Sequence, residues 1–275
     1  MERADVDGIT LEYEVSGTGE PVVFVHGAFI ADVFRPLLGE PSLAGQYQLI
    51  TYRRRGYGGS SRTPGPISAE RQAADCQALL RYLGVERVYV VGHSFGGAVA
   101  LQLALDAPEV VHSLALLEPA LFVGASAQAY RESLARSAQG YREEGAVLVM
   151  EEFFRARWPG YSRAALEQVL PGVFEQAVAD APATFELDIG LLDWTFGEAK
   201  ARRITQPALV VLGGESPALH PRFGETYRLL LDWLPHAEGF VLPGATHFLH
   251  LESPSCSRGM AEALAAFCAR YPLPT

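Results

Sequence analysis

Residues 90–97 read Val-Val-Gly-His-Ser-Phe-Gly-Gly and contain a G-x-S-x-G motif between an apolar run and an alanine-rich run. A serine held on a sharp turn from a strand into a helix needs small residues two positions to either side. A Cβ atom there would collide with the adjoining strand or helix. Gly92 and Gly96 meet that requirement. The stretch therefore predicts a strand, a tight turn and a helix, with Ser94 at the turn as a candidate nucleophile.

The sequence around this turn alternates between strand and helix patterns. Ser94 lies between a strand predicted over residues 87–91 and a helix predicted over 95–105, and another strand follows at 113–117. Strand, helix and strand in this order form a βαβ unit, whose strands are parallel within one sheet. The other predicted elements are strands over 8–15, 21–25, 48–52, 207–212 and 239–242 and helices over 69–82, 221–233 and 255–270. The chain is therefore predicted to have an α/β fold.

Residues 120–200, named here the helical insertion, interrupt this alternation because they read almost wholly as helix. Short breaks are predicted at Gly140, Pro159-Gly160, Pro171-Gly172 and Ala181-Pro182. The segment is rich in aromatic side chains, and we expect most of them to form its own core. The rest, with Trp158 and Trp194 as candidates, are predicted to line an apolar pocket over Ser94.

Composition and charge narrow the classes of function. The 275 residues are 49% hydrophobic and 20% charged, and no apolar run approaches the ~18 to 20 residues that span a bilayer. The first residues lack the basic start and apolar stretch of a secretory signal. A formal net charge of −10 disfavours nucleic acid as a partner, and we expect the run Arg53-Arg54-Arg55 to form salt bridges. These features predict a cytoplasmic protein without nucleic-acid or membrane partners, and they indicate no particular oligomeric state.

Four stretches match the motifs of a known superfamily. They are His26-Gly27-Ala28-Phe29, Arg54-Arg55-Gly56-Tyr57-Gly58-Gly59-Ser60, Gly92-His93-Ser94-Phe95-Gly96-Gly97, and residues 244–254. With their order along the chain, they resemble the α/β-hydrolase superfamily, and the resemblance covers essentially all of the chain outside the helical insertion. It implies a mostly parallel eight-stranded sheet flanked by helices, built from residues 1–119 and 201–275. It also implies that the helical insertion is a cap domain and that chemistry occurs at the C-terminal edge of the sheet.

A serine nucleophile needs a base to take its proton, and a neutral imidazole is the usual base near neutral pH. His247 is the candidate, because it follows the last predicted strand, where such a fold brings a loop back over the nucleophile. His250 is the nearest rival. We expect His26 and His93, which belong to two of the motifs, to brace their loops by hydrogen bonds.

The base in turn needs a carboxylate that holds its tautomer and offsets the imidazolium charge. In most of the superfamily this acid is an Asp after the strand predicted here to end at Leu212, but this chain has Ser216 at about that place. Glu118 ends the strand predicted over 113–117 and should emerge on the same sheet edge as Ser94. We favour Glu118 as the acid, with Glu215 as the alternative. The Leu-Leu-Glu-Pro stretch also bears a weaker resemblance to the zearalenone lactone hydrolase branch, in which a Glu after this strand completes the triad.

Backbone N–H groups are suitable donors for the oxyanion of a tetrahedral intermediate. The motifs assign this role to Phe95, which follows the nucleophile, and to Ala28, in the loop after His26-Gly27. Phe29 is the alternative donor in that loop and a candidate contact for the substrate. No G-x-G-x-x-G stretch opens a helix after a strand, and no histidine pair has the spacing of metal ligands. The expected chemistry therefore uses neither a cofactor nor a metal.

Together these residues predict hydrolysis of a carboxylic ester or lactone through an acyl-enzyme that water then cleaves. The aromatic side chains favour a small to medium apolar substrate. A serine at position 94 excludes the haloalkane dehalogenases and epoxide hydrolases of this fold, because those relatives attack with an Asp. Hydrolysis of a carbon–carbon bond next to a ketone stays open as an alternative, as does a non-catalytic small-molecule receptor on the same fold.

Overall fold

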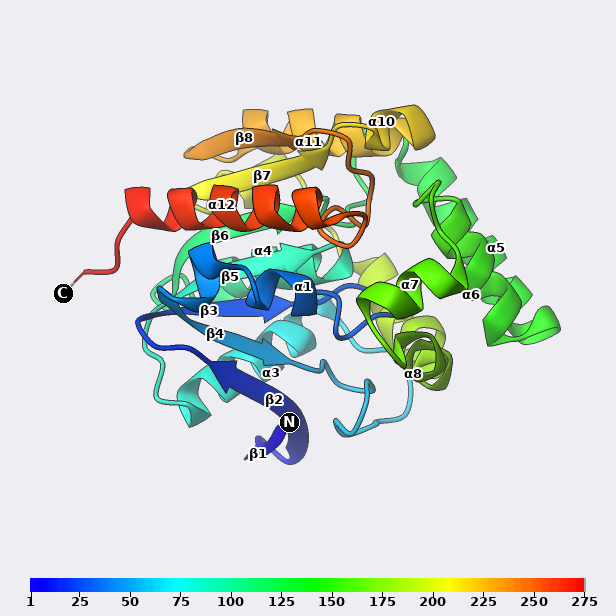
Figure 1. Cartoon of the computed structure of the whole chain (residues 1–275), viewed down its shortest axis with the longest axis horizontal. Helices are drawn as coiled ribbons and strands as arrows, with labels where there is room; N and C mark the ends of the chain where they lie inside the picture. Colours follow the sequence, from blue (N-terminus) through cyan, green and yellow to red (C-terminus); the bar gives the residue numbers. More distant parts are fainter. Residues whose placement is uncertain (275) are drawn as a thin grey trace.

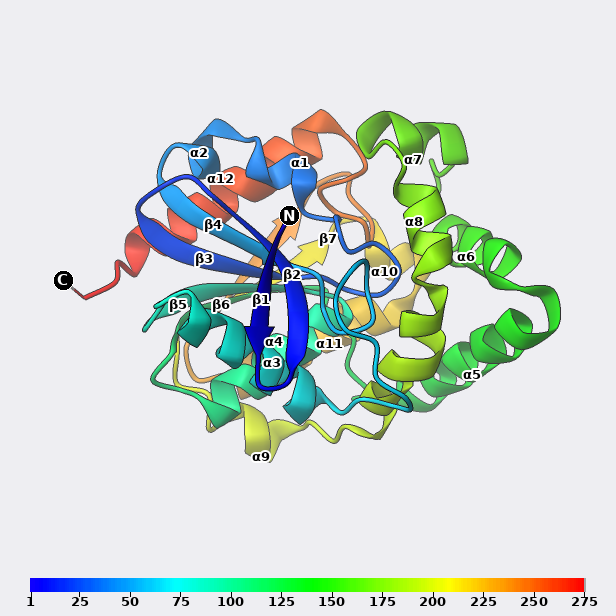
Figure 2. The same cartoon turned by 90° about the horizontal axis from the view of Figure 1, so that it is seen from below.

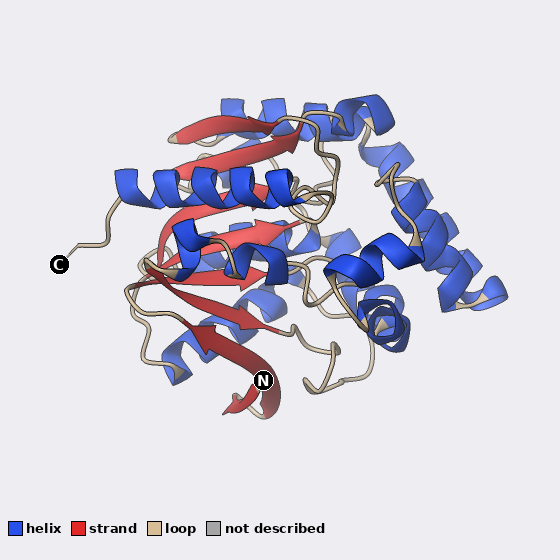
Figure 3. Ribbon diagram, in the orientation of Figure 1, coloured by secondary structure: helices blue, strands red, loops and turns tan. Residues whose placement is uncertain are grey.

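The computed structural model describes residues 1–274 and contains one eight-stranded sheet with helices on both faces (Figures 1 and 3). The strands are β1 (Glu2–Val6), β2 (Ile9–Ser16), β3 (Glu20–Val25), β4 (Tyr47–Tyr52), β5 (Val88–His93), β6 (Val111–Leu117), β7 (Ala208–Gly213) and β8 (Ala237–Leu242). Their order across the sheet is β1-β2-β4-β3-β5-β6-β7-β8. Only β2 runs against its neighbours, so the predicted mostly parallel eight-stranded sheet is confirmed.

The helices outside the insertion cover both faces of the sheet. They are α1 (Arg35–Leu38), α2 (Pro41–Ala44), α3 (Ala69–Tyr82), α4 (Phe95–Asp106), α9 (Glu198–Ala201), α10 (Ser216–Leu219), α11 (Pro221–Trp233) and α12 (Pro254–Arg270). Helices α1, α2 and α12 lie on one face, and α3, α4 and α11 lie on the other (Figures 1 and 2). The Ser68 and Ser253 hydroxyls cap the first turns of α3 and α12, which fixes where these helices begin.

Alternation along the strands divides the apolar core into two layers. Val23 and Val90 pack under α3 and α4, whereas Val22 and Val91 point to the opposite face, into the layer that includes α12. Strands β3 and β5 are buried on both faces, which explains their continuous apolar sequences. Because β3 and β5 are packed on both faces, the position and direction of the turn at Ser94, which follows β5, are fixed.

The helical insertion connects β6 to β7 and stands at the C-terminal ends of the strands (Figure 1). It contains α5 (Ala127–Glu144), α6 (Ala146–Arg155), α7 (Arg163–Val169), α8 (Val173–Ala179), a π-helical turn η1 (Ala183–Leu187) and a 3₁₀ turn η2 (Asp188–Asp193). Across residues 1–274, no helix combines the length and the apolar character that a membrane crossing requires.

Two features differ from the expectations for these elements. Helix α5 continues through Gly140 and ends at Glu144, and the following Gly145 has a positive φ of 87°, which glycine adopts readily. The predicted break at Gly140 was wrong because one glycine costs a helix only ~1 kcal/mol. A Cβ atom there would approach Val149 of α6 to 3.0 Å, so the glycine permits close helix packing. The edge strand β1, which is short and partly exposed, had not been predicted.

The basic run at residues 53–55 ties several segments together. Arg54 is buried and pairs with Asp188 of the insertion at 2.7 Å, while Arg55 pairs with Asp75 of α3 at 2.6 Å. Arg53 is also paired, with Glu12 and Asp32. The run therefore forms the scaffold of salt bridges that was expected, and one of these bridges links the core to the helical insertion.

Candidate active site

Ser94 occupies the turn between β5 and α4 with φ 53° and ψ −122°, a conformation that L-residues rarely adopt. The surrounding backbone leaves no room for larger neighbours. A Cβ atom on Gly96 would lie 2.0 Å from the carbonyl oxygen of Val25, and one on Gly92 would lie 2.6 Å from that of Gly96. Glycine is therefore required at both positions, as the motif predicted. The tight turn holds the Ser94 side chain at the C-terminal edge of the sheet.

Three side chains form a continuous hydrogen-bonded chain at this turn. His247 Nε2 lies 3.2 Å from Ser94 Oγ, and His247 Nδ1 lies 2.8 Å from Glu118 Oε2. All three are buried, with exposed fractions of 7% for Ser94, 2% for His247 and 3% for Glu118. A carboxylate accepts but does not donate, so Nδ1 carries the proton and Nε2 is left to accept the proton of Ser94. The arrangement can therefore transfer a proton from the hydroxyl to the imidazole.

The strand register explains why Glu118 reaches this position. His93 of β5 pairs with Leu117 of β6, so Ser94 and Glu118 are the next residues on two neighbouring strands. The backbone N–H of Glu118 donates to Val211 at 3.2 Å, and its second carboxylate oxygen accepts the N–H of Gly213 at 2.8 Å. One oxygen is therefore held by β7 while the other is left for His247.

The alternative acid lies elsewhere. Glu215 is exposed at the start of α10, and its backbone N–H donates to Ala245 at 2.9 Å. Its side chain lines a separate hollow beside Trp158 and Gly160. Ser216, at about the place where the superfamily usually has an Asp, is fully buried. Of the two candidate acids, the structure brings only Glu118 into contact with His247.

Burial changes the proton affinity of both partners. It raises the pKa of Glu118 to about 7, and it lowers the pKa of His247 well below its usual value. The cations of Arg222 and Arg157 lower the pKa of His247 further. Arg222 stacks on Phe223, with 3.8 Å from its guanidinium carbon to the ring centre, and the Phe223 ring lies 4.8 Å from that of His247. The site therefore favours a neutral imidazole, the form that a general base needs.

The predicted oxyanion donors lie beside Ser94. Within residues 1–274 the backbone N–H groups of Ala28 and Phe95 form no hydrogen bond to the protein. The N–H of Phe29, the alternative donor, is occupied by the Thr184 hydroxyl at 3.1 Å. The loop approaches closely, because a Cβ atom on Gly27 would lie 2.9 Å from the Cβ of Ser94. Ala28 and Phe95 are thus the donors that this geometry leaves available.

The other motif histidines hold loops in place. His26 Nε2 accepts the backbone N–H of Arg54 at 2.9 Å, and His93 Nε2 lies 2.9 Å from the carbonyl oxygen of His247. His250, the rival base, forms its contact with the carbonyl oxygen of Val33 at 2.8 Å and stacks on Phe34. These contacts are of the bracing type expected for His26 and His93, and they direct His250 away from Ser94.

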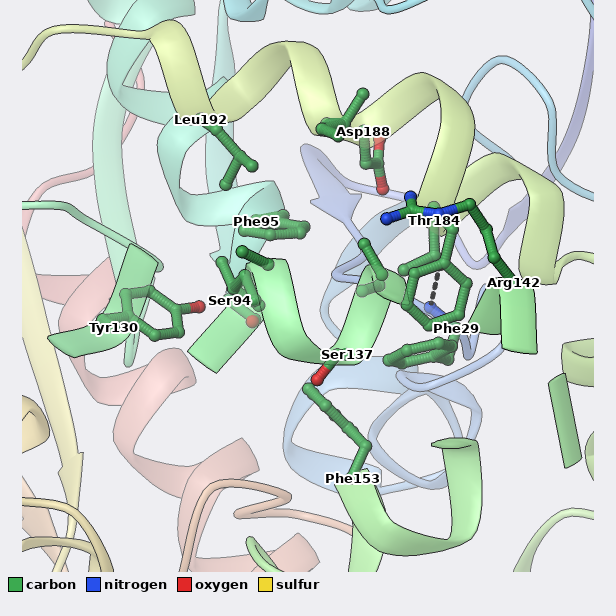
Figure 4. Close-up of a pocket in the computed structure, with 16 residues that line it drawn as sticks. Phe29, Ser94, Phe95, Tyr130, Ser137, Arg142, Phe153, Thr184, Asp188 and Leu192 are labelled. Atoms are coloured by element: carbon green, nitrogen blue, oxygen red, sulfur yellow. Dashed lines mark hydrogen bonds between the residues drawn. The ribbon is translucent and has the colours of Figure 1, made fainter. Parts of the chain in front are cut away.

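A cavity of about 210 Å³ opens beside Ser94 (Figure 4). Its walls are mainly apolar and come from both the core and the helical insertion: Ala28, Phe29, Phe95, Tyr130, Leu134, Ala135, Ala138, Phe153, Phe185, Ile189 and Leu192. The polar groups are fewer: Ser94, Ser137, Arg142, Thr184 and Asp188. A mainly apolar cavity with a few polar groups is typical of a small-molecule site.

Three side chains were predicted to contact the substrate, and they have different positions. Phe29 lines the cavity, with its ring 5.5 Å from that of Phe185. Trp158 lies outside the lining and packs on Phe248 at 6.0 Å between ring centres. Trp194 also lies outside it, and its indole N–H donates to Gln102 of α4 at 2.7 Å. Neither tryptophan lines the cavity beside Ser94, and both are buried.

Apart from Ser94, sequence reasoning did not single out the polar residues of the cavity. Thr184 and Asp188 lie in η1 and η2, and Arg142 lies near the end of α5. No motif marks them, and each becomes part of the site only through the packing of the insertion on the core. The one available signal was that Arg54 and Tyr57, in a superfamily motif, require buried partners, and Asp188 is that partner for both.

Comparison with known proteins finds sequence relatives that include components of acetoin cleaving systems. The dihydrolipoyllysine-residue acetyltransferase component of the acetoin cleaving system from Pseudomonas putida is 30% identical over 257 residues, covering 92% of this chain and 65% of that protein. Its counterpart from Cupriavidus necator is 40% identical over 141 residues, covering 51% of this chain and 37% of that protein. The chain thus spans from about a third to about two thirds of the length of these relatives.

Solved structures share the whole fold. A thermophilic esterase from Thermogutta terrifontis superposes with a TM-score of 0.80 at 23% identity, covering 97% of this chain and 99% of the other. The enol-lactonase from Burkholderia xenovorans superposes with a TM-score of 0.77 at 21% identity, covering 98% and 100%. The family model of the alpha/beta hydrolase fold matches residues 20–254, a range that includes Ser94, Glu118 and His247. The chain belongs to the alpha/beta hydrolase fold family.

Proposed function

We propose that this protein is a serine hydrolase that cleaves the carboxylic ester or lactone bond of a small to medium, largely apolar substrate. The observation that carries the proposal is the continuous chain of hydrogen-bond contacts from Glu118 through His247 to Ser94. A serine, an imidazole and a carboxylate in this order are the groups that nucleophilic acyl transfer requires. The esterase and enol-lactonase structures noted above support the fold on which this chemistry would run.

The proposed reaction uses protein groups and water alone. Ser94 Oγ attacks the carbonyl carbon while His247 Nε2 takes the hydroxyl proton, and Glu118 stabilises the imidazolium that forms. The N–H groups of Ala28 and Phe95 donate to the oxyanion. When the intermediate collapses, His247 returns the proton to the leaving alcohol and an acyl-Ser94 ester remains. Water then attacks that ester with His247 as base, which releases the acid and restores Ser94.

We further propose that the helical insertion, residues 120–200, acts as a cap over a core formed by residues 1–119 and 201–275. The support is the shared cavity, because Ser94 and Phe29 come from the core while Tyr130, Phe153 and Phe185 come from the insertion. A cap that closes an apolar site keeps bulk water from the reacting groups and strengthens their electrostatic interactions. It would also set which substrates enter.

The proposal is tested with para-nitrophenyl esters of short fatty acids. We expect a rapid release of nitrophenol in proportion to the protein, followed by steady turnover, because acylation precedes hydrolysis of the acyl-enzyme. Ser94→Ala should lose both phases, with a fall in kcat of about 10⁴-fold or more. An inert wild-type protein that still binds such esters would instead favour the receptor alternative, and turnover that survives Ser94→Ala would contradict the mechanism.

A further inference from the structure

Arg142 is an exposed cation that lines the substrate cavity and forms no ion pair with a carboxylate of the described residues. It lies near the C-terminal end of α5, and its side chain reaches toward Thr184 and Asp188 at the cavity wall (Figure 4). Across residues 1–274, Arg142 forms no ion pair within 4.0 Å and no side-chain hydrogen bond. Most other cavity groups are apolar, so this guanidinium is the feature that distinguishes the wall opposite Ser94.

Asp188 does not neutralise Arg142, although both line the cavity. The two carboxylate oxygens of Asp188 accept from the guanidinium of Arg54 at 2.7 and 2.8 Å. They also accept from Gln72 at 3.0 Å and from the Tyr57 hydroxyl at 2.7 Å. Asp188 is 1% exposed, so its negative charge is offset within the protein by buried Arg54. The cavity is therefore left with the positive charge of Arg142.

The positions of Ser94 and Arg142 define two ends of a binding site. Ser94 and Arg142 project from different sides of the cavity, and the rings of Phe95, near Ser94, and Phe29, near Arg142, line it as well (Figure 4). A molecule that spans the cavity would place its carbonyl at one end and an anion at the other, joined by an apolar segment. A guanidinium presents parallel N–H groups that match the two oxygens of a carboxylate, and a single cation matches a single negative charge.

We propose that the substrate carries a carboxylate distal to the bond that is cleaved, and that Arg142 binds this carboxylate. The inference rests on the proposed function and names its substrate class: esters or lactones whose acyl chain ends in a second, free acid group. Arg142 is then a specificity-determining residue that contacts substrate without taking part in the proton transfers at Ser94. The apolar segment between the two ends is held by the aromatic walls.

The test compares two series of para-nitrophenyl esters. One series is the monoesters of linear dicarboxylic acids of increasing length, and the other is the esters of monocarboxylic acids of equal length. We expect kcat/KM to favour the acidic ester at the length that spans from Ser94 to Arg142. Arg142→Gln should reduce that preference by about 5- to 30-fold, because the pair is partly exposed to water, while Arg142→Lys should keep part of it.

Arg136 supplies a matched control on the same helix. It is exposed and lines an adjoining hollow with Gln139 and Glu143, and it is not among the residues that line the cavity beside Ser94. Arg136→Gln removes the same charge from the protein and from α5, so it reports any long-range effect of net charge on acidic substrates. We expect this variant to keep the wild-type preference for the acidic ester.

The outcomes separate this inference from the proposed function. Ser94-dependent hydrolysis of neutral esters without a preference for the acidic ones would overturn the inference and leave the proposed function standing. The same holds if the preference survives Arg142→Gln. If neither series is hydrolysed, calorimetry on Ser94→Ala protein compares a monomethyl dicarboxylate with the dimethyl ester. Tighter binding of the acid that is lost with Arg142→Gln supports the site, and equal binding overturns it.

Discussion

The sheet edge and the helical insertion contribute to the site in different ways. At the sheet edge, Ser94, Glu118 and His247 are buried and each is fixed by hydrogen bonds to strands or loops of the core. In the insertion, Phe185 and Arg142 are more exposed, and Phe185 is held mainly by stacking on Tyr141 at 4.4 Å between ring centres. Hydrogen bonds require particular atoms at particular distances, whereas apolar packing tolerates substitution of similar volume. We therefore expect the proposed chemistry to depend on the first region and the choice of substrate on the second.

The largest effect expected from this contrast comes from Glu118. Glu118→Gln keeps the size of the side chain but removes the charge that, in the proposed mechanism, orients His247 and stabilises its protonated form. We expect kcat for a para-nitrophenyl ester to fall by about 10³- to 10⁴-fold, with a smaller change in KM. Steady-state kinetics with purified protein measures both constants.

Glu215→Gln is the control for this loss, since Glu215 is exposed and has no contact with His247. We expect its kcat to stay close to that of the wild type. A large loss with Glu215→Gln and a small one with Glu118→Gln would show that the carboxylate contact in the structure is not the one used in catalysis.

The pH dependence provides the next test of the sheet edge. The pKa of Glu118 is raised to about 7 by burial, so the buried pair takes up a proton as the pH falls through this value. The proposed mechanism needs a charged carboxylate and a neutral imidazole, and kcat/KM should therefore decline below about pH 7.

In Glu118→Gln the residual activity depends on His247 alone. Burial and the cations of Arg222 and Arg157 lower the pKa of this histidine. A lowered pKa keeps the imidazole neutral in more acidic solution, so the acid limb of the residual activity should move to lower pH. A profile of kcat/KM against pH for both proteins measures the shift, and a limb that stays in place or moves upward would contradict the charge assignment.

The same contrast explains what the sequence could predict. Strand β5, the turn at Ser94 and helix α4 follow from an apolar run, two obligatory glycines and an alanine-rich stretch, which are local signals. The place of Glu118 follows as well, because the end of β6 must emerge beside the end of β5 in a parallel sheet. The positions of these residues could be predicted from the sequence because residues at the ends of neighbouring parallel strands lie side by side.

The cavity walls could not be assigned in this way. Helical periodicity shows which residues are apolar, but not which neighbouring element each helix packs against. Trp158 and Trp194 were therefore reasonable candidates for the cavity, yet they pack on Phe248 and bond to Gln102. Arg142 and Thr184 line the cavity through the tertiary packing of α5 and η1, which no local signal reports.

A comparison of Phe185 with Trp194 tests the insertion and has the smallest expected effect on kinetics. Phe185→Ala removes a ring from the cavity wall, and we expect KM for an apolar ester to rise by about 5- to 30-fold, because apolar contact with the substrate is lost. Trp194→Phe keeps a ring outside the cavity but leaves the buried Gln102 amide oxygen without its donor. That variant should lose about 1 to 3 kcal/mol of unfolding free energy with little change in KM. Denaturant unfolding and steady-state kinetics measure the two quantities, and a raised KM in folded Trp194→Phe protein would place this side chain in contact with substrate after all.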